Sequence, residues 1–307
     1  MSWATAVDLF AGAGGFTAGA TQAGVRVLWA ANHWQAAVRV HADNHPETAH
    51  ICQDLHQADW SRVPEHDILL ASPACQGHSR ARGAERPHHD ATRSTAWAVV
   101  SCAEFHRPRV IVVENVAEFC RWKLYPIWRQ ALETLGYQVA PHVIDAADHG
   151  VPQHRERVYI VCTRTRSPMM LRMAPREHVA ASSFIQFDTG NWSLIDKPGR
   201  AAATKARIQS GRHRFGDRFV MPYYSSGSGR TGRSISRPIG TITTIDRWGV
   251  VDGERTRMLT ANESRDAMGF PSDYRLPERH RDAMQMLGNA VCPPVARDLL
   301  TEIRSAA

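Results

Sequence analysis

Short apolar runs alternate with helical segments through the first half of the chain, and this alternation restricts the possible folds more than any other feature of the sequence. Strands are expected at residues 4–10, 25–31, 51–54, 67–70 and 110–113, and helices at 17–23, 34–43, 96–105 and 128–135. Two more strands, at 137–144 and 158–161, are expected to form a hairpin. Strands that alternate with helices predict an α/β fold with a mainly parallel, doubly wound sheet and helices on both of its faces.

The second half of the chain has a different composition, because Gly, Ser, Arg and Pro dominate after Arg164 and predict a smaller, loop-rich domain. Residues 164–237 contain fourteen basic and four acidic side chains, a surplus of ten, whereas the whole chain has a net charge of +7. One basic region beside a near-neutral remainder is typical of a nucleic-acid-binding surface. A β-like pattern resumes at 237–244, helices are expected at 262–268 and 281–287, and residues 288–291 are expected to open a last helix.

Several classes of protein are disfavoured by what the sequence lacks. No apolar run approaches the roughly 20 residues that a membrane-spanning helix needs, and the start of the chain has no basic segment typical of a secretion signal. The six cysteines form no CxxC pair, which argues against a zinc ribbon and a disulfide framework. We therefore expect no metal site, no membrane contact and a reducing, cytoplasmic location.

Cys75 is the first candidate catalytic residue, because it lies in a turn just after the apolar run 67–70. Ligands of open α/β sheets bind at the carboxyl ends of strands, and a thiolate there can act as a nucleophile if positive charge stabilises it. Arginines 80, 82, 86 and 93 supply such charge. A buried structural cysteine is the competing interpretation. The segment 80–95 is either a lid or a solvated surface loop.

Two further strand ends carry candidate functional residues. The glycine-rich turn 11–15 lies between a strand and a helix, where backbone N–H groups can meet a ligand, although close helix packing would also require glycine. Glu114 ends the strand expected beside that of Cys75, so it either meets the cysteine or forms a salt bridge. Trp34 could stack on an adenine or belong to the core.

Taken together, these motifs resemble the DNA cytosine-C5 methyltransferase family, and they occur in the family's order over nearly the whole chain. The matching segments are Asp8–Phe16, Cys75–Gln76 with Ser79, Glu114–Val116, Gln153–Arg157, Arg237–Thr244 and Gly288–Val291. The resemblance implies a Rossmann-like class I methyltransferase sheet in residues 1–163 and 257–307, and a target-recognition domain in residues 164–256. It also implies S-adenosylmethionine as cofactor and double-stranded DNA as substrate, in an enzyme of the kind found in bacterial or phage restriction–modification systems.

The resemblance implies a covalent reaction on a base that has been flipped out of the duplex. Cys75 would add to C6 of cytosine and Glu114 would bind N3, while Arg155 would hold O2 and Arg157 and Gln153 would brace the site. The implied cofactor-binding residues are Phe10, Ala11, Gly12, Gly14, Gly15, His33, Trp34, Asp54, Leu55 and Asn289. The implied DNA-binding residues are Gln76, Ser79, Arg80, Arg82, Arg230, Arg233, Arg237 and Thr244.

Three positions depart from the family's pattern. His33 stands where a glutamate usually accepts from both ribose hydroxyls, Ala74 replaces a proline, and His78 replaces a phenylalanine. These departures leave open a different one-carbon donor. The motifs also leave open a tRNA methyltransferase of the same fold and a catalytically silent DNA-binding relative. We expect the protein to act as a monomer.

Overall fold

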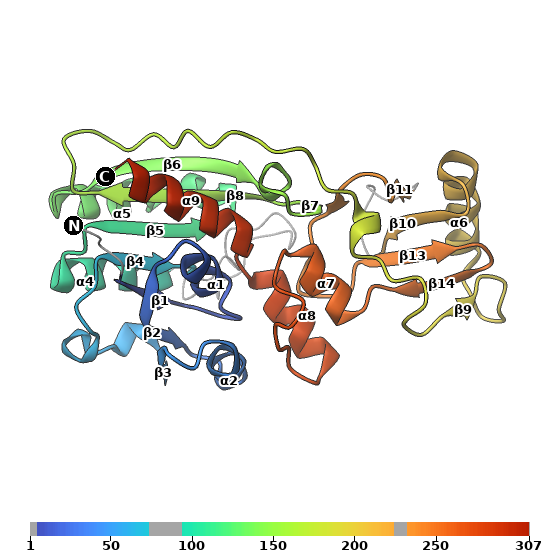
Figure 1. Cartoon of the computed structure of the whole chain (residues 1–307), viewed down its shortest axis with the longest axis horizontal. Helices are drawn as coiled ribbons and strands as arrows, with labels where there is room; N and C mark the ends of the chain where they lie inside the picture. The colour runs from blue at the N-terminus through green and yellow to red at the C-terminus, as the bar shows by residue number, and fades with distance from the viewer. Residues whose placement is uncertain (1–4, 74–93, 224–231, 307) are drawn as a thin grey trace. The chain divides into compact units, whose positions relative to one another are not determined.

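The structure is a computed structural model that describes residues 5–73, 94–223 and 232–306. The chain packs as two units, and each contains a sheet of its own (Figure 1). Unit 1 comprises residues 1–145, 156–174 and 290–307, and unit 2 comprises residues 146–155 and 175–289. Among the described residues, no helix is both long and apolar enough to span a membrane.

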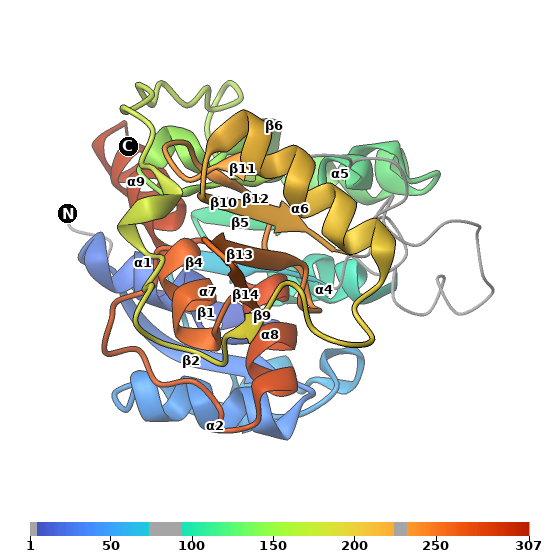
Figure 2. The same ribbon diagram turned by 90° about the vertical axis from the view of Figure 1, so that its right-hand side faces the viewer.

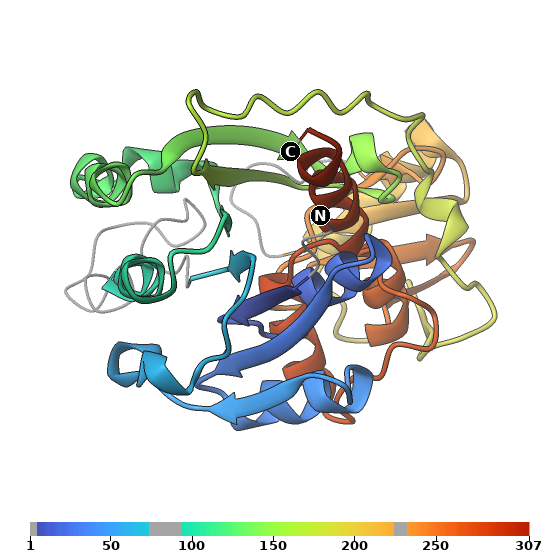
Figure 3. The same cartoon turned by 60° about the vertical axis from the view of Figure 1, so that its left-hand side comes forward.

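Unit 1 is built on a seven-stranded sheet in the order β3-β2-β1-β4-β5-β8-β6, with the green β6 at one edge (Figure 3). Its strands are β1 (Thr5–Leu9), β2 (Arg26–Asn32), β3 (Ala49–Cys52), β4 (Ile68–Ala71), β5 (Val110–Asn115), β6 (Gln138–Asp145) and β8 (Glu156–Thr163). The first five strands pair in parallel, and β8 runs antiparallel to both β5 and β6. The expected parallel α/β sheet and the β6–β8 hairpin are thereby confirmed.

The central strands of unit 1 are apolar because both of their faces are covered. All four residues of β4 and all six of β5 are buried, as expected for the middle of a parallel sheet. The helices are α1 (Gly15–Gln22), α2 (Gln35–Asn44), α4 (Trp97–His106), α5 (Tyr125–Thr134) and α9 (Pro293–Ser305). Val99 of α4 and Trp128 of α5 share a core cluster with Ile111 of β5. Short 3-10 turns lie at Leu55–Gln57, Trp60–Arg62, Ser94–Ala96 and Ala117–Arg121.

Unit 2 contains a five-stranded antiparallel sheet in the order β11-β10-β13-β14-β9 and a parallel pair, β12-β7. The strands are β7 (Gln153–His154), β9 (Ser193–Leu194), β10 (Arg218–Pro222), β11 (Arg233–Ser234), β12 (Ile239–Gly240), β13 (Trp248–Asp252) and β14 (Arg255–Met258). The helices are α6 (Ala202–Phe215), α7 (Ala261–Ala267) and α8 (His280–Asn289), and 3-10 turns lie at Ala146–His149 and Ala181–Ser183. Helix α6 covers β10 (Figure 2). A Cβ atom added to Gly211 of α6 would lie 2.3 Å from the Phe219 ring, so glycine permits this close packing.

Two features of unit 2 differ from the sequence expectation. Helix α8 continues through Asn289, so residues 288–289 end one helix and do not open the next. Residues 146–155 and 257–289 pack with unit 2, although the expected boundaries assigned them to the catalytic domain. The reason is visible at Gln153, whose Nε2 donates to the Ala267 carbonyl at 2.8 Å and whose Oε1 accepts from the Ile242 amide at 2.7 Å. The functional assignment of residues 164–256 stays a prediction.

Candidate functional site

The turn after β1 contains three residues with positive φ, a conformation that glycine adopts more readily than other residues. Phe10, Gly12 and Gly14 all lie in the left-handed region, with φ of 59°, 54° and 85°. The Gly14 amide closes the turn by donating to the Ala11 carbonyl at 2.8 Å. A left-handed phenylalanine is strained, and such strain persists mainly at binding and catalytic sites. The half-buried Phe10 is therefore held in place by the turn and does not follow its own backbone preference.

Gly15 has a different reason to be glycine. A Cβ atom at Gly15 would lie 2.0 Å from the Val291 carbonyl oxygen, and one at Gly19 would lie 2.5 Å from the Ala296 Cβ. Helix α1 thus packs directly on α9 and the residues before it. The packing explanation considered for the turn accounts for Gly15, whereas φ accounts for Gly12 and Gly14.

The next two strands bring further cofactor candidates to the same edge of the sheet. Asn32 Oδ1, at the end of β2, accepts from the Trp34 amide at 2.9 Å. His33 is exposed, and its carbonyl accepts a 3.6 Å hydrogen bond from the Cys52 thiol at the end of β3. Asp54 Oδ1 accepts from the His56 amide at 3.0 Å. Because β1, β2 and β3 are parallel neighbours, the turn, Trp34 and Asp54 all follow carboxyl ends at one edge. Leu55 follows Asp54 and is buried.

The residues that follow β4 are tied to both neighbouring strands at this edge. The Ser72 amide donates to the Leu9 carbonyl of β1 at 3.1 Å, and Asn115 Nδ2, at the end of β5, donates to the Pro73 carbonyl at 3.1 Å. Pro73 is the last described residue before Cys75. Asn115 therefore fixes the position of the last described residue before the expected nucleophile.

Glu114 and Arg157 form an ion pair beside this anchor. Arg157 Nε, on β8, lies 3.2 Å from Glu114 Oε1, on β5, and the two side chains are only 16% and 7% exposed. A buried carboxylate next to a guanidinium can hold a hydrogen-bonding partner in a fixed orientation. The salt-bridge interpretation of Glu114 is confirmed, and its partner is another candidate catalytic residue. Whether Glu114 also meets Cys75 stays a prediction, because Cys75 lies outside the described residues.

Arg155, expected to hold the base while Arg157 braces the site, is hydrogen-bonded to backbone carbonyls, and its expected role stays a prediction. It belongs to unit 2, where its two terminal nitrogens donate to the Ile242 carbonyl at 3.1 Å and the Gly288 carbonyl at 3.0 Å. Together with Gln153, it braces the backbone of residues 242–244 and the end of α8. Asn289, expected at the cofactor, is the last residue of α8 and belongs to unit 2.

The expected DNA-binding residues are divided between described and undescribed parts of the chain. The Arg233 guanidinium carbon lies 5.5 Å from the centre of a Trp248 ring, Arg237 is exposed, and Thr244 is half-buried. A Cβ atom at Gly288 would lie 2.2 Å from the Thr244 amide nitrogen, so α8 packs directly on this backbone. Six expected site residues lie outside the described residues: Cys75, Gln76, Ser79, Arg80, Arg82 and Arg230. Ala74 and His78 lie outside them as well.

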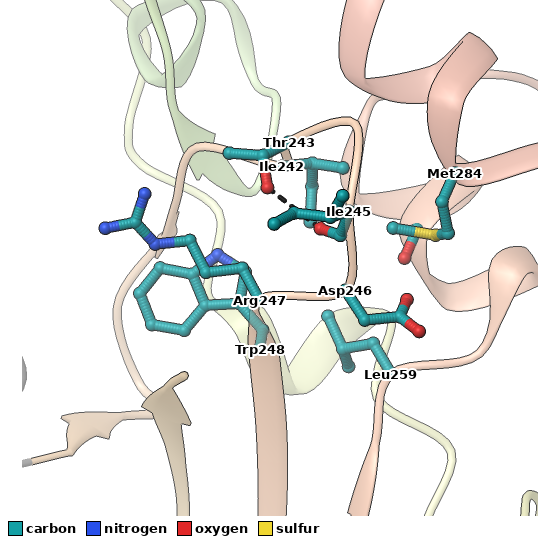
Figure 4. Close-up of a pocket in the computed structure, with 9 residues that line it drawn as sticks. Ile242, Thr243, Ile245, Asp246, Arg247, Trp248, Leu259 and Met284 are labelled. Carbon is teal, nitrogen blue, oxygen red and sulfur yellow. Dashed lines mark hydrogen bonds between the residues drawn. The ribbon is translucent and has the colours of Figure 1, made fainter. Parts of the chain in front are cut away.

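A small pocket of unit 2 lies next to the backbone that Arg155 braces (Figure 4). It encloses about 180 Å³, including space open to solvent, and its lining includes Ile242, Trp248 and Met284. Thr243 Oγ1 donates to the Ile245 carbonyl at 2.9 Å within it. Sites for cofactor-sized ligands are usually about 300 Å³ or larger, and none of the expected cofactor residues lines this pocket. It is not the cofactor site.

Sequence reasoning missed one buried polar group near the glycine turn. Asp8 is fully buried in β1, and Thr17 Oγ1 donates to its Oδ2 at 2.8 Å. Burial raises the pKa of Asp8 to about 7, although hydrogen bonds from Thr17 lower it. The available signal was an acidic residue inside an otherwise apolar central strand.

Comparison with known proteins agrees with this arrangement. The family model described as C-5 cytosine-specific DNA methylase matches residues 4–305. The chain is 26% identical to the type II methyltransferase M.NlaX of Neisseria lactamica over 98% of this chain and 96% of that protein. It is 29% identical to the type II methyltransferase M.HgiDI of Herpetosiphon aurantiacus over 97% and 94%. Its fold resembles the crystal structure of a DNMT2 mutant from Spodoptera frugiperda, with a TM-score of 0.71, 17% identity and coverage of 98% and 99%. The chain therefore belongs to the C-5 cytosine-specific DNA methylase family.

Proposed function

We propose that the protein is a DNA (cytosine-5-)-methyltransferase that transfers a methyl group from S-adenosylmethionine to C5 of cytosine in a specific duplex sequence. The observation that carries this proposal is the ion pair between the buried Glu114 and the half-buried Arg157, which lies at the end of β5 next to the strand that leads to Cys75. Membership of the family supports the same reaction.

The proposed chemistry begins when the Cys75 thiolate adds to C6 of a cytosine that has left the helical stack. The new S–C6 bond uses the electrons of the C5–C6 double bond, so C5 becomes nucleophilic as part of an enamine. Glu114 donates a hydrogen bond to N3 through a carboxyl proton and so stabilises the negative charge that the ring acquires. When bound, S-adenosylmethionine would supply an electrophilic methyl group, and C5 would take it as the sulfonium–methyl bond breaks and leaves S-adenosylhomocysteine. The C5 proton then leaves to solvent, and breaking the S–C6 bond restores the double bond and the thiolate.

The two arginines have separate roles in this proposal. Arg157 orients Glu114 and presents the cation that faces the base, including its O2. Arg155 and Gln153 act as positioning residues, since their hydrogen bonds hold the backbone of unit 2. This division reverses the roles that the resemblance alone suggested for Arg155 and Arg157.

The residues at the ends of β1, β2 and β3 fit S-adenosylmethionine. The left-handed Phe10 and the half-buried Trp34 supply aromatic surfaces for an adenosine, and Asp54 supplies an exposed carboxylate that can accept from the adenine amine. The backbone of Gly12 and Gly14 allows close approach to the amino-acid part of the cofactor. Ala11, Gly15, Leu55 and Asn289 complete the proposed set.

DNA binding is assigned to the basic second domain, residues 164–256. The surplus of ten positive charges in its residues 164–237 suits phosphate contacts, and arginines such as Arg233 and Arg237 suit bidentate contacts with guanine. Thr244 is proposed to contact the DNA backbone, together with Gln76, Ser79, Arg80, Arg82 and Arg230. The relatives named type II methyltransferases suggest a role beside a restriction enzyme, in a protein that acts as a monomer.

Bisulfite sequencing of DNA and RNA from cells that express the protein tests this function. We expect one short DNA sequence to carry 5-methylcytosine and RNA to carry none above background. Cys75→Ser should abolish the mark, and an oligonucleotide with 5-fluorocytosine in the target should form a covalent adduct with the wild type only. Methylation confined to tRNA would transfer the assignment to an RNA substrate. An adduct that survives in Cys75→Ser would exclude Cys75 as the nucleophile.

A further inference from the structure

A chain of hydrogen-bonded side chains runs from the half-buried His50 to the buried Asp8. His50 Nε2 lies 2.8 Å from His41 Nδ1, and His41 Nε2 lies 3.0 Å from Thr17 Oγ1. Thr17 Oγ1 donates to Asp8 Oδ2 at 2.8 Å. The second oxygen of Asp8 is buried and has no partner within the described parts of the chain. The four side chains come from β3, α2, α1 and β1, so the chain crosses unit 1 from its edge to its core.

The direction of every donor in this chain follows from the charge of Asp8. An ionised carboxylate only accepts, so Thr17 must donate its single hydroxyl proton to Asp8. His41 must then donate from Nε2 to Thr17, and its Nδ1 must accept from His50 Nε2. One charge state therefore fixes the tautomers of both histidines.

When Asp8 is protonated through this chain, the donor and the acceptor of every hydrogen bond exchange roles. No member of the chain is then left charged. A proton that binds His50 at Nδ1 allows Nε2 to give its proton to His41 Nδ1. His41 Nε2 then gives its proton to Thr17 Oγ1, and Thr17 gives its own to Asp8 Oδ2. Both histidines end neutral with a proton on Nδ1, and the proton that entered at His50 is accounted for on Asp8.

The last two members of this chain, Thr17 and Asp8, join the two sides of the glycine turn. Asp8 is the second-to-last residue of β1, and Thr17 lies in the first turn of α1. The backbone and hydroxyl of Thr17 both bond to Asp8, and these bonds close the base of the turn between residues 10 and 14. His45, whose ring centre is 4.8 Å from that of His41, bonds to the backbone of Gly14. The charge state of Asp8 thus acts on the backbone proposed to hold the cofactor.

We propose that Asp8 is a positioning residue for the glycine turn, and that proton transfer along His50, His41 and Thr17 couples its charge to the affinity for S-adenosylmethionine. This proposal rests on the cofactor assignment made above. The ionised form holds the first turn of α1 against β1 through two accepted hydrogen bonds and favours the cofactor-binding geometry. The protonated form donates to Thr17 and loosens that contact.

The surroundings of Asp8 suit such a coupling. The residues opposite it on the flanking strands, Ala30 and Leu70, do not titrate. The titratable groups that face the chain from α2 and β3 are histidines. Burial, together with His45 and His50, holds the pKa of His41 well below its usual range, and burial also lowers the pKa of His50. Burial lowers the pKa of His45 to about 4. The histidines therefore stay neutral where Asp8, with a pKa near 7, changes charge.

Imidazole nitrogen NMR on the cofactor-free wild type tests the chain directly. His41 should carry its proton on Nε2 at pH 8.5 and on Nδ1 at pH 5.5, and His41→Phe identifies its signals. A single His41 tautomer over this whole range would overturn the proposal. This measurement needs neither a substitution at Asp8 nor a bound cofactor.

Calorimetry with S-adenosylhomocysteine between pH 6 and pH 8.5 tests the coupling. We expect the wild type to bind about three- to fivefold more tightly at the higher pH, which is the change that results if cofactor binding lowers a pKa of about 7 by half a unit to one unit. Asp8→Asn, which donates to Thr17 as protonated Asp8 does, should bind at the weaker level at every pH. His66→Asn, a buried histidine outside the chain, should behave as the wild type.

The outcomes separate this proposal from the proposed function. Binding that is independent of pH in the wild type, or dependent on pH in Asp8→Asn, would overturn the coupling alone. S-adenosylhomocysteine that fails to bind at every pH would overturn the cofactor assignment and the coupling with it.

Discussion

Asn115 Nδ2 donates a 3.1 Å hydrogen bond to the carbonyl of Pro73, and this bond joins the end of β5 to the end of β4. Asn115 is 1% exposed, and its Oδ1 also accepts from the Val116 amide at 2.9 Å. One side chain therefore sets the distance between Glu114 and Pro73, the last described residue before Cys75.

Asn115→Asp should impair the covalent step more than folding. The carboxylate can still accept from Val116, but it faces the Pro73 carbonyl without a proton to donate. A buried carbonyl without a hydrogen-bond donor costs about 1–3 kcal/mol, and displacement of Pro73, two residues before Cys75, should slow adduct formation with 5-fluorocytosine DNA at least tenfold. The matched control is Asn44→Asp. In the wild type the Asn44 side-chain amide donates to the Val40 carbonyl of the same helix, away from the proposed site. If Asn115→Asp forms the adduct at the wild-type rate, the hydrogen bond between Asn115 and Pro73 has no role in catalysis.

Substitution of the two arginines should separate catalysis from stability. Arg157→Gln removes the cation beside Glu114, and we expect adduct formation to fall about a hundredfold with little change in the urea midpoint. Arg155→Lys cannot reach both the Ile242 and Gly288 carbonyls, so the free energy of unfolding should fall by about 1–3 kcal/mol. Urea titration and the adduct assay on both variants decide this. If Arg155→Lys is as stable as the wild type and Arg157→Gln still forms the adduct, the assignment of roles is wrong.

The resemblance assigned Arg155 to the base and Arg157 to bracing the site, and the sequence alone could not show which of the two lies beside Glu114. The reason is local, because both arginines belong to one short segment between two expected strands. The strand is interrupted between β7, which ends at His154, and β8, which begins at Glu156. The interruption sends Arg155 into unit 2 and leaves Arg157 in unit 1.

Apolar patterning predicted the elements of unit 1 better than those of unit 2. The strands of unit 1 are continuous apolar runs because the sheet is covered on both faces. Helix α6 escaped prediction because only Ile208 and Gly211 of its fourteen residues are buried, which leaves no apolar stripe to recognise. The contacts of Asp8 with Thr17 and of Asn115 with Pro73 also escaped, since each depends on how separate elements pack.

Glu263→Gln should destabilise unit 2 strongly. Glu263 and Arg257 are 0% and 1% exposed and form two bonds of 2.7 and 2.6 Å, and Glu263 also accepts from the Gln186 and Thr260 amides at 2.8 Å. Removing one partner of a buried pair typically costs about 3–5 kcal/mol. Glu133→Gln breaks the exposed pair with Arg129 and should cost less than about 1 kcal/mol. Equal urea midpoints for the two variants would show that the buried Glu263–Arg257 pair stabilises the protein no more than the exposed Glu133–Arg129 pair does.

The contribution of His66 to the stability of the protein should be lost as pH decreases from 6.5 towards 4. Burial lowers the pKa of His66 to about 4, although a hydrogen bond to Pro64 opposes the shift. The unfolded chain therefore binds a proton below pH 6.5 that the folded chain does not bind, so stability present above pH 6.5 is lost as pH falls. The shift corresponds to at most about 3 kcal/mol. His66→Asn should reduce the difference in urea midpoint between pH 7 and pH 5, whereas the exposed His213→Asn should leave it unchanged.

His33→Glu should strengthen cofactor binding. His33 is exposed directly after β2, where the family resemblance places a glutamate that accepts from both ribose hydroxyls. A neutral imidazole can accept only one hydrogen bond. The missing charge-assisted bond is worth about 1.5–3 kcal/mol, so we expect His33→Glu to bind S-adenosylhomocysteine roughly 10- to 100-fold more tightly.

The control for this prediction is His56→Glu, which adds the same charge at another exposed position of unit 1. Calorimetry should show tighter binding in His33→Glu only, and methylation at limiting S-adenosylmethionine should become faster. That result would mean that the wild-type site takes the usual cofactor with reduced affinity, because the ribose lacks an acceptor while Phe10, Trp34 and Asp54 remain. The opposite result is a wild type that neither binds S-adenosylhomocysteine nor transfers methyl groups, yet traps 5-fluorocytosine DNA when another one-carbon donor is supplied. In that case His33 belongs to a site reshaped for the other donor, and adding a glutamate should weaken the binding of that donor.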